Sequence, residues 1–455
     1  MIGLSSSSAR TDLAQRLTEI SGLGNVSTDR QMTKTYEVDG LVPTAVVFAT
    51  TTEQVSRVVR AGNESGASII PWGSGSKQTV GPCLSAADIV LCLKPINQII
   101  ELNTSNFSVE IGAGLSNAAL QKQMGKHNLF FPFDPLYLET STIGGELATN
   151  ASGPWRAAYG TARDIVLGIT AVTPTGDVIH TGGRTMKNVA GIDLCKLLIG
   201  SWGTLGIITE TVLRLFPLPK VSRSLCLTFA GIEDAFRLVH RLLSSPLTPG
   251  AVELIDGIAG RNSAPISDSP LAEDEVQLLI DISGNREEVE WHLKEISALA
   301  EENQVRHPTT LEDEAATCAW NTYRGAHQAI LSAAPSTFQG KASVPLIRQT
   351  DMFKAIKEIG QKYQVAAGIR GHCYNGILYP YVVAGDDHAV NIINDLKKAA
   401  ADLGGFFIVE SAPFPVRKSA GALPQRSDHT LMKRLKTEFD PNNILNPGKL
   451  MGDAD

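Results

Sequence analysis

The chain has 455 residues, of which 43% are hydrophobic and 19% are charged, and its formal net charge is −7 at pH 7. This length predicts two or three domains with a substantial core. The mild acidity argues against a nucleic-acid-binding protein, which would carry basic clusters that neutralise phosphates. No run of about 18 apolar residues could span a membrane. The amino-terminal sequence MIGLSSSSARTDLAQ also lacks the pattern of a secretory signal, so we expect a cytoplasmic protein.

Six cysteines are scattered along the chain and form no C-x-x-C pair. This spacing excludes a zinc ribbon and an iron–sulfur cluster, and it favours reduced core cysteines over a disulfide framework. If the protein transfers electrons, it needs an organic cofactor, and any cluster belongs to a partner.

The first half of the chain alternates strands, helices and glycine turns. A strand is predicted at residues 45–49, and Thr51-Thr-Glu-Gln54 forms a capping box for a helix that ends at Gly66. The next strand starts at Ser68 and leads into a glycine loop. Further strands are predicted at residues 89–93, 99–102, 109–113, 165–173, 178–181 and 207–215, with a helix after residue 116.

The second half begins after Pro217-Leu-Pro219, which we take as the first domain boundary. Two βαβ-like passes predict an antiparallel sheet with helices on one face. No internal sequence repeat is found, and the tail from Ser427 starts with a helix. The predicted strands are 225–229, 276–282, one near 343, 377–383 and 406–409, and the helices are 233–243, 286–302, one around 320, one from 350, and 389–403.

The glycine loop Pro71-Trp-Gly-Ser-Gly-Ser-Lys77 is the first candidate binding element. Consecutive backbone N–H groups in such a turn can hold an anionic oxygen, and the hydroxyls of Ser74 and Ser76 add donors. The loop lacks the P-loop pattern and the third glycine of a Rossmann fingerprint. By itself it is equally consistent with a tight turn.

Two further segments are rich in glycine and hydroxyl side chains. The first is Ser141-Thr-Ile-Gly-Gly145, followed by Asn150-Ala-Ser-Gly153. The second is a long polar stretch, GGRTMKNVAGID at residues 182–193 followed by GSWGTLGIITE at residues 200–210. Long loops without secondary structure are usually functional or disordered, and the apolar residues in this one disfavour disorder.

Taken together, PWGSGSK, STIGG, GGRTMKNVAGID, GSWGTLGIITE and the terminal ILNPGK resemble the vanillyl-alcohol-oxidase or PCMH-type flavoprotein family. The chain is most similar to its glycolate oxidase and D-lactate dehydrogenase branch, over nearly its whole length. The resemblance implies an α+β fold with a two-subdomain PCMH-type FAD-binding domain at residues 1–218. A ferredoxin-like α+β substrate cap would follow at 219–420, and a tail at 421–455 would return to the FAD domain.

By this resemblance the glycine segments hold FAD. No histidine or cysteine stands in an obvious context for covalent attachment, so the FAD is expected to dissociate. Residues 71–77 would wrap the pyrophosphate, and Asn446 would lie near the isoalloxazine. The full set of expected FAD-binding residues is Pro71, Trp72, Gly73, Ser74, Gly75, Ser76, Lys77, Ser141, Thr142, Gly144, Gly145, Ala151, Gly153, Ile207, Ile208 and Asn446.

This sequence departs from the branch in the motifs that usually bind a metal ion. Its dehydrogenases usually carry G-H-x-G-D-G-N-x-H and a later G-E-H-G. Here the first segment keeps His372 but has Asn375 and Tyr379 in place of the aspartate and the last histidine, and the second keeps Glu410 but has Ser411. Only His372 and Glu410 remain as metal ligands, so we expect a degenerate metal site. His372 is then better interpreted as a hydrogen-bonded histidine of the cap.

Three functional hypotheses follow. The first is an FAD-dependent subunit that takes a hydride from a 2-hydroxy acid such as glycolate or D-lactate and passes electrons to a partner. His372 or Tyr379 would be its base, and Arg324 would bind the substrate carboxylate unless it is a surface arginine. The second is a degenerate FAD-binding companion subunit, in a complex with a second FAD subunit and an iron–sulfur protein that could bring it to a membrane. The third, an oxidase of another alcohol or a sugar, is disfavoured by the motifs.

Overall fold

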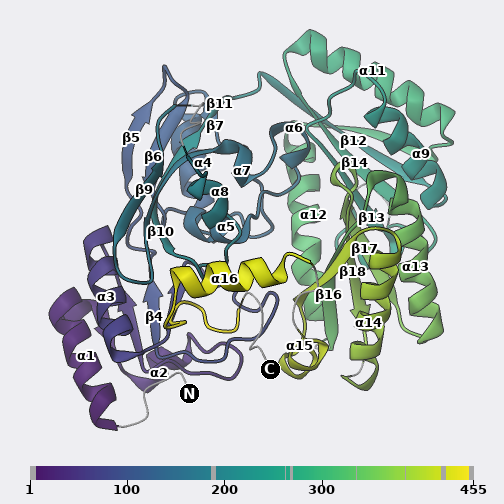
Figure 1. Ribbon diagram of the computed structural model, residues 1–455. Helices are drawn as coiled ribbons and strands as arrows, with labels where there is room; N and C mark the ends of the chain where they lie inside the picture. The colour runs from purple at the N-terminus through teal and green to yellow at the C-terminus, as the bar shows by residue number, and fades with distance from the viewer. Residues whose placement is uncertain are drawn as a thin grey trace. The chain divides into compact units, whose positions relative to one another are not determined.

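The computed structural model describes residues 7–185, 191–261, 263–266, 270–334, 336–384, 386–421 and 427–449. The chain divides into two units, each with its own core (Figure 1). Unit 1 comprises residues 1–152, 161–218 and 421–455, and unit 2 comprises residues 153–160 and 219–420. Both units combine helices and sheets, which confirms the predicted α+β class. The sequence did not indicate that residues 153–160 join unit 2.

Unit 1 starts with a four-stranded sheet in which three strands run parallel. Helices α1 (Ser7–Ser21) and α3 (Thr52–Ser65) lie side by side against it (Figure 1). Thr51 caps α3 as predicted, but the Gln54 side chain accepts from the Thr50 N–H instead of closing a reciprocal box. In sheet order the strands are β1 (Val26–Ser27), β2 (Ala45–Phe48), β4 (Ile89–Cys92) and β3 (Ile69–Trp72), and the short helix α2 spans Arg30–Lys34.

A five-stranded antiparallel sheet forms the second part of unit 1. A small pair, β7 (Leu129–Phe130) and β11 (Phe216–Pro217), accompanies it. In sheet order the strands are β5 (Ile99–Asn103), β6 (Ser108–Gly112), β10 (Ile207–Arg214), β8 (Val166–Val172) and β9 (Val178–Gly182), and the helices are α4 (Asn117–Gly125), α5 (Ile143–Thr149), α7 (Ala162–Ile165) and α8 (Leu194–Leu198).

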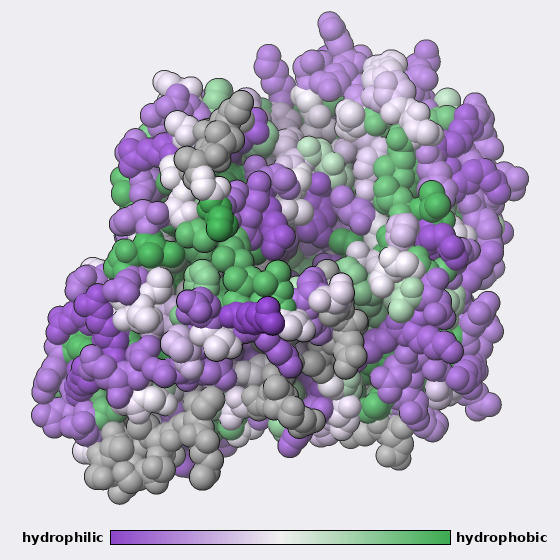
Figure 2. Space-filling view, in the orientation of Figure 1, coloured by the Kyte–Doolittle hydropathy of each residue, from purple (hydrophilic) through white to green (hydrophobic). Residues whose placement is uncertain are grey.

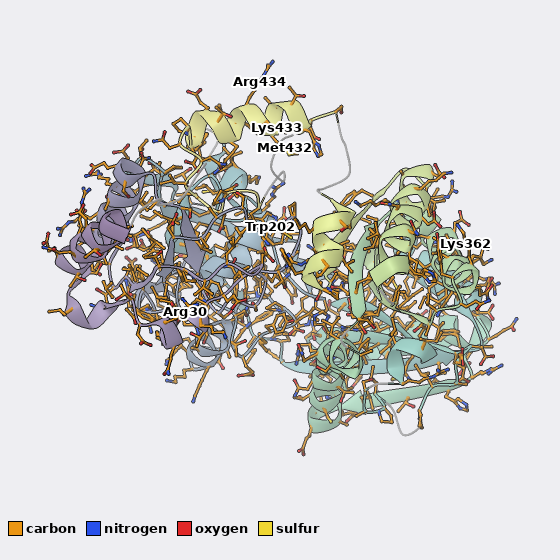
Figure 3. All side chains as sticks on the ribbon, turned by 90° about the horizontal axis from the view of Figure 1, so that it is seen from below. Arg30, Trp202, Lys362, Met432, Lys433 and Arg434 are labelled. Atoms are coloured by element: carbon orange, nitrogen blue, oxygen red, sulfur yellow. The ribbon has the colours of Figure 1, made fainter. Side chains whose placement is uncertain are left out.

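The carboxy-terminal tail returns to unit 1 through helix α16 (His429–Phe439) and an extended segment beside β3. The Ile69 N–H donates to the Ile444 carbonyl (2.7 Å). The ammonium of Lys436 on α16 donates to the carbonyls of Thr204 (2.9 Å) and Leu445 (3.0 Å) and pairs with the buried Asp440. Lys433 and Arg434 of the same helix are exposed (Figure 3). These bonds fix the tail next to the Trp202–Thr204 turn of the same unit.

Unit 2 is built on one antiparallel sheet of eight strands, in the order β15–β12–β14–β13–β17–β18–β16–β19. The first four strands form one βαββαβ half in the 4-1-3-2 order of a ferredoxin-like fold, and the last four form a second half in the mirrored order. The halves join where β13 pairs with β17. The strands are β12 (Val221–Phe229), β13 (Ala251–Asp256), β14 (Val276–Gly284), β15 (His307–Glu312), β16 (Thr337–Ser343), β17 (Ala367–His372), β18 (Ile377–Val383) and β19 (Phe406–Ser411).

Helices cover both faces of this sheet, so the predicted one-sided arrangement is wrong. The main core packs four long helices and α15 against one face, and α12 (Asp313–Ala333) packs on the other. The exposed sides of α9 and α13 are hydrophilic (Figure 2). The remaining helices are α9 (Ile232–Leu243), α11 (Arg286–Glu302), α13 (Gln349–Lys362), α14 (Asp386–Asp402) and α15 (Phe414–Ala420), with the single turns α6 (Arg156–Tyr159) and α10 (Gly257–Gly260).

Candidate functional site: a glycine-lined cleft and a polar sheet face

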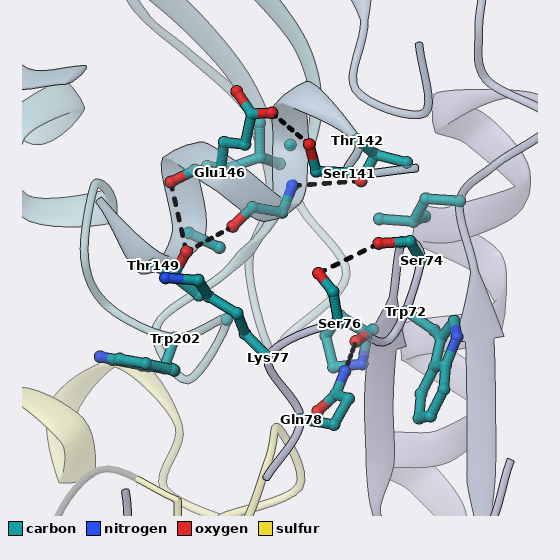
Figure 4. A pocket seen from close by; sticks show the side chains of 18 of the residues that line it. Trp72, Ser74, Ser76, Lys77, Gln78, Ser141, Thr142, Glu146, Thr149 and Trp202 are labelled. Carbon is teal, nitrogen blue, oxygen red and sulfur yellow. Dashed lines mark hydrogen bonds between the residues drawn. The ribbon is translucent and has the colours of Figure 1, made fainter. Parts of the chain in front are cut away.

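An elongated cleft in unit 1 lies where the loop after β3 meets α5 and the start of β10 (Figure 4). It encloses about 910 Å³, including its open mouth. Every residue expected to hold the cofactor lines this cleft except Gly153, which belongs to unit 2. Part of the predicted 182–193 segment, residues 186–190, lies outside the described residues. Four of the five motifs, which are far apart in sequence, therefore meet at this cleft, whereas most of the described residues of the 182–193 segment line a separate pocket of unit 1.

Two of the glycines are required by close contacts at the floor of the cleft. A Cβ at Gly75, where φ is +77°, would lie 2.3 Å from the indole ring of Trp72. A Cβ at Gly73 would lie 2.1 Å from the Thr142 hydroxyl. The 71–77 loop thus rests directly on the 141–145 segment, which leaves its backbone open to a ligand.

The returning tail closes one end of the cleft. The Asn446 side chain donates to the carbonyl of Trp202 (2.7 Å), and its backbone N–H donates to Ile69 (3.0 Å). Both Asn446 (φ +43°) and Trp202 (φ +58°) have left-handed backbone conformations, which are costly for such residues and cluster at functional sites. The Asn446 Oδ1 atom is buried and has no donor. It is available to a ligand that carries an N–H or O–H group.

Glu146 is a buried acid in the cleft lining that the sequence analysis missed. It accepts from the Ser141 hydroxyl (2.6 Å) and from the Asn117 amide (2.9 and 3.1 Å). Burial raises its pKa to about 8, against the opposing effects of these hydrogen bonds and of the Lys77 charge. At neutral pH the carboxyl is protonated, since burial disfavours the charged form.

Cationic side chains then set the electrostatics of the cleft. Lys77 extends toward Thr149 and Trp202 (Figure 4), and Lys449 anchors the tail by donating to the Gln78 carbonyl. With Glu146 neutral, the described lining carries two lysines and no ionised acid. Lysines, hydroxyls and exposed backbone N–H groups fit a ligand with phosphate groups and a polar ring, so the residues present suit a dinucleotide.

In unit 2, polar side chains gather on the sheet face that α12 covers. At the junction of the two halves, Glu253 on β13 lies opposite His372 on β17. His372 Nδ1 is 2.7 Å from both carboxylate oxygens of Glu253, which is only 1% exposed. The carboxylate therefore fixes the imidazole and leaves Nε2 for a ligand or a proton. Glu253 could not be found from the sequence, because it stands inside the unrecognised strand AVELID.

Arg370 lies two residues before His372 on the same face. It is buried, with its guanidinium stacked 4.0 Å over the Tyr323 ring and Nη1 donating to the Tyr381 hydroxyl (3.2 Å). The same hydroxyl bonds to His327 Nδ1 (2.9 Å). The predicted strands omitted β17, so Arg370 was not considered as a site residue.

Three other predicted site residues, Tyr379, Glu410 and Arg324, also belong to unit 2. Tyr379 stands edge-on to His372, with the ring centres 5.2 Å apart. Burial, reinforced by the nearby Glu410 carboxylate, raises the pKa of Tyr379 well above its ordinary value. Glu410 accepts from Gln339 (3.3 Å), so the carboxylate that contacts His372 is that of Glu253. Arg324 bonds to Asn321, one turn earlier on its own helix.

Among the residues that the structure describes, no group of three or more His, Cys, Asp or Glu side chains is arranged to hold a metal ion. Within the described ranges, every helix is too short or too polar to cross a lipid bilayer.

Comparison with known families gives two matches that together span most of the chain. The family described as "FAD binding domain" matches residues 43–182, and the family described as "FAD linked oxidases, C-terminal domain" matches residues 218–450. The glycolate oxidase subunit GlcD of Bacillus subtilis is 31% identical over 460 residues, 96% of each chain. A D-lactate dehydrogenase of Archaeoglobus fulgidus is 30% identical over 413 residues, 89% of this chain and 91% of the relative.

Solved structures share the fold at low sequence identity. p-Cresol methylhydroxylase with substrate bound superposes with a TM-score of 0.79 at 18% identity, covering 98% of this chain and 97% of the other. A 4-ethylphenol oxidase from Gulosibacter chungangensis gives a TM-score of 0.75 at 17% identity, with the same coverage. These likenesses confirm the predicted PCMH-type fold.

Proposed function

Since the chain belongs to the family of FAD-linked oxidases and is an FAD-dependent oxidoreductase, we propose that it oxidises a small 2-hydroxy acid such as glycolate or D-lactate. The names of its relatives, glycolate oxidase subunit and D-lactate dehydrogenase, support this substrate class. One observation carries the proposal. The buried Glu253 bonds to His372, and both lie on the sheet face against which α12 packs. This pair supplies a base of fixed orientation, which hydroxy-acid oxidation needs.

The unit 1 cleft holds the cofactor in this proposal. The 71–77 loop and the 141–145 segment bind its phosphates, and Asn446 Oδ1 accepts from its polar ring system. Gly153, which belongs to unit 2 and does not line the cleft, is left out of this proposal. When bound, FAD accepts the hydride that leaves the substrate carbon.

Proton transfer is assigned to His372. With Nδ1 held by Glu253, its Nε2 takes the proton of the substrate hydroxyl. Tyr379 keeps its phenolic proton, because its pKa is well above the ordinary value, so it serves as a hydrogen-bond donor and not as the base. Neither role requires Glu410, which is bonded to Gln339.

None of the six cysteines forms an iron–sulfur cluster motif, so the sequence offers no second redox centre within the chain. In this proposal the electrons therefore leave to a partner protein. We propose a second FAD subunit and an iron–sulfur protein as these partners, consistent with relatives that are named as subunits.

The second candidate function is that of a companion subunit without its own substrate chemistry. It is favoured by Asn375, Tyr379 and Ser411, which replace usual residues of the metal motifs.

One experiment separates these functions. The purified chain is mixed without oxygen with glycolate or with D-lactate, and the flavin absorbance is followed. Bleaching is the expected result. A flavin that stays oxidised with both acids but is reduced by dithionite would favour the companion subunit. A protein that takes up no added FAD would contradict the assignment of the cleft.

Substituting Gly75 tests the cleft directly. We expect Gly75→Ala to weaken FAD binding at least 100-fold, because the new Cβ would lie 2.3 Å from the Trp72 ring and displace the loop. Gly81→Ala is the matched control, since Gly81 has a similar φ of +72° but nothing within 4 Å of its Cβ. Both variants share the backbone cost of a left-handed alanine. Titration of apoprotein with FAD, followed by flavin fluorescence, measures the difference, and equal affinities would exclude this role of the loop.

A further inference from the structure

Arg370 is a buried cation that forms no ion pair with any residue that the structure describes. Its side chain is almost fully enclosed, with 3% of the residue exposed. No carboxylate oxygen of the described residues lies within 4 Å of its guanidinium. Two partly buried ammonium groups elsewhere do have a direct carboxylate partner, since Lys357 pairs with Asp256 and Lys436 pairs with Asp440. The Glu253 carboxylate is close enough to act on the charge of Arg370, but it bonds to His372 and makes no direct contact with the guanidinium. Buried charges are normally paired directly, so the guanidinium can still take an anionic ligand.

The unused part of Arg370 is the edge of the guanidinium that binds carboxylates best. Nη1 donates to the Tyr381 hydroxyl, which is its only hydrogen bond to the described part of the chain. Nε is buried without an acceptor. The Nε and Nη2 groups point in the same direction and can form two parallel bonds to one carboxylate. Neither of these two groups donates to an acceptor among the residues that the structure describes.

Aromatic neighbours hold that fork in one orientation. The Tyr323 ring stacks on the guanidinium at 4.0 Å, and His327 fixes the Tyr381 hydroxyl that Nη1 contacts. Arg370 and His372 stand two positions apart on one strand, so their side chains leave the same face roughly 6.6 Å apart at the backbone. In a 2-hydroxy acid the carboxylate and the hydroxyl stand on adjacent carbons, which fits a cation and a base this close.

We propose that Arg370 is the residue that binds the substrate carboxylate, in a bidentate pair, and so presents the neighbouring hydroxyl to His372. This inference rests on the proposed function. It replaces the prediction for Arg324, which directly follows the buried Tyr323 on α12 and bonds to Asn321 of the same helix. Arg370 thereby selects acids over uncharged alcohols.

The test compares Arg370→Gln with Arg324→Gln in the FAD-loaded full chain. Oxalate, which cannot be oxidised by hydride loss, serves as a binding probe in calorimetry, and glycolate and its amide serve as substrates in flavin reduction. For Arg370→Gln we expect the oxalate Kd and the glycolate KM to rise about 100-fold, with FAD content unchanged. The preference for glycolate over its amide should largely disappear. Arg324→Gln should stay within threefold of the wild type.

Arg370→Lys keeps the charge but not the fork, so it should recover only part of the oxalate affinity. It also carries the test if Arg370→Gln fails to fold. Unchanged oxalate binding in the Arg370 variants, or a loss in Arg324→Gln instead, would overturn the proposal, as would a wild type that binds neither oxalate nor glycolate. If the wild type binds oxalate through Arg370 but no acid reduces the flavin, the anion site stands and the proposed function fails.

Discussion

Replacing His372 with asparagine should lower the rate constant of flavin reduction by glycolate or D-lactate about 1,000-fold. Asparagine can still bond to Glu253, but it cannot accept a proton, and general-base catalysis contributes roughly 10²–10⁴ to enzymatic rates. Stopped-flow absorbance under anaerobic conditions measures this rate constant at saturating acid. The effect should fall on the rate constant more than on KM, because the carboxylate is bound elsewhere.

Glu253→Gln should lower the same rate constant about 10–100-fold, since the imidazole keeps a hydrogen-bond partner but loses the charge that stabilises its protonated form. His240→Asn is the control. That histidine lies on α9 on the opposite side of the sheet, where it contacts the Leu346 carbonyl. A full rate in His372→Asn, with the flavin normally bound, would exclude the histidine as the base.

Replacing Glu146 with glutamine should stabilise the folded chain at alkaline pH. The pKa of Glu146 is raised from the ordinary 4.5 to about 8, because its burial disfavours the ionised form. Below pH 4.5 the folded and unfolded states both hold the proton. Between pH 4.5 and about 8 the unfolded chain releases it while the folded chain keeps it, so stability falls by ~1.4 kcal/mol per pH unit.

Glutamine removes this dependence and keeps the contacts. Its carbonyl can accept from Ser141, and its amide can donate to the Asn117 Oδ1, which has no donor. We expect thermal midpoints close to those of the wild type at pH 5, and a gain of about 4 kcal/mol in the free energy of unfolding at pH 9. The exposed Glu139, changed to glutamine, should show no such gain. A pH-independent difference for Glu146→Gln would show that the carboxyl ionises normally in the folded state.

The sequence was most informative where chemistry is concentrated in short motifs. The loops at 71–77 and 141–145 combine glycines with hydroxyls, and they were assigned to FAD because five such motifs together resemble one flavoprotein family. The structure places them around one cleft. Glu146 escaped notice although it directly follows two of these glycines, because only burial distinguishes it from a surface glutamate.

Unit 2 was harder to predict, for two physical reasons. Strands β13, β15 and β17 were not recognised, and β17 has the sequence AGIRGH, in which two glycines and an arginine interrupt any apolar pattern. The partnership of Glu253 with His372 spans more than a hundred residues and depends on strand register. No local pattern reports such a contact. The motif that contains His372 identified the histidine, but not the strand that carries it.

The two halves of the unit 2 sheet also have a consequence for the order of folding. Within each half the strands pair over long ladders, with nine register pairs between β12 and β14, whereas β13 and β17 share only three. Contacts within a half close shorter loops than contacts between halves, so each half can gain structure before the junction forms. Glu253 comes from the first half, and His372 and Arg370 come from the second. The chemistry of this face is therefore assembled by the final docking step, and a chain in which only one half has folded carries no base of fixed orientation.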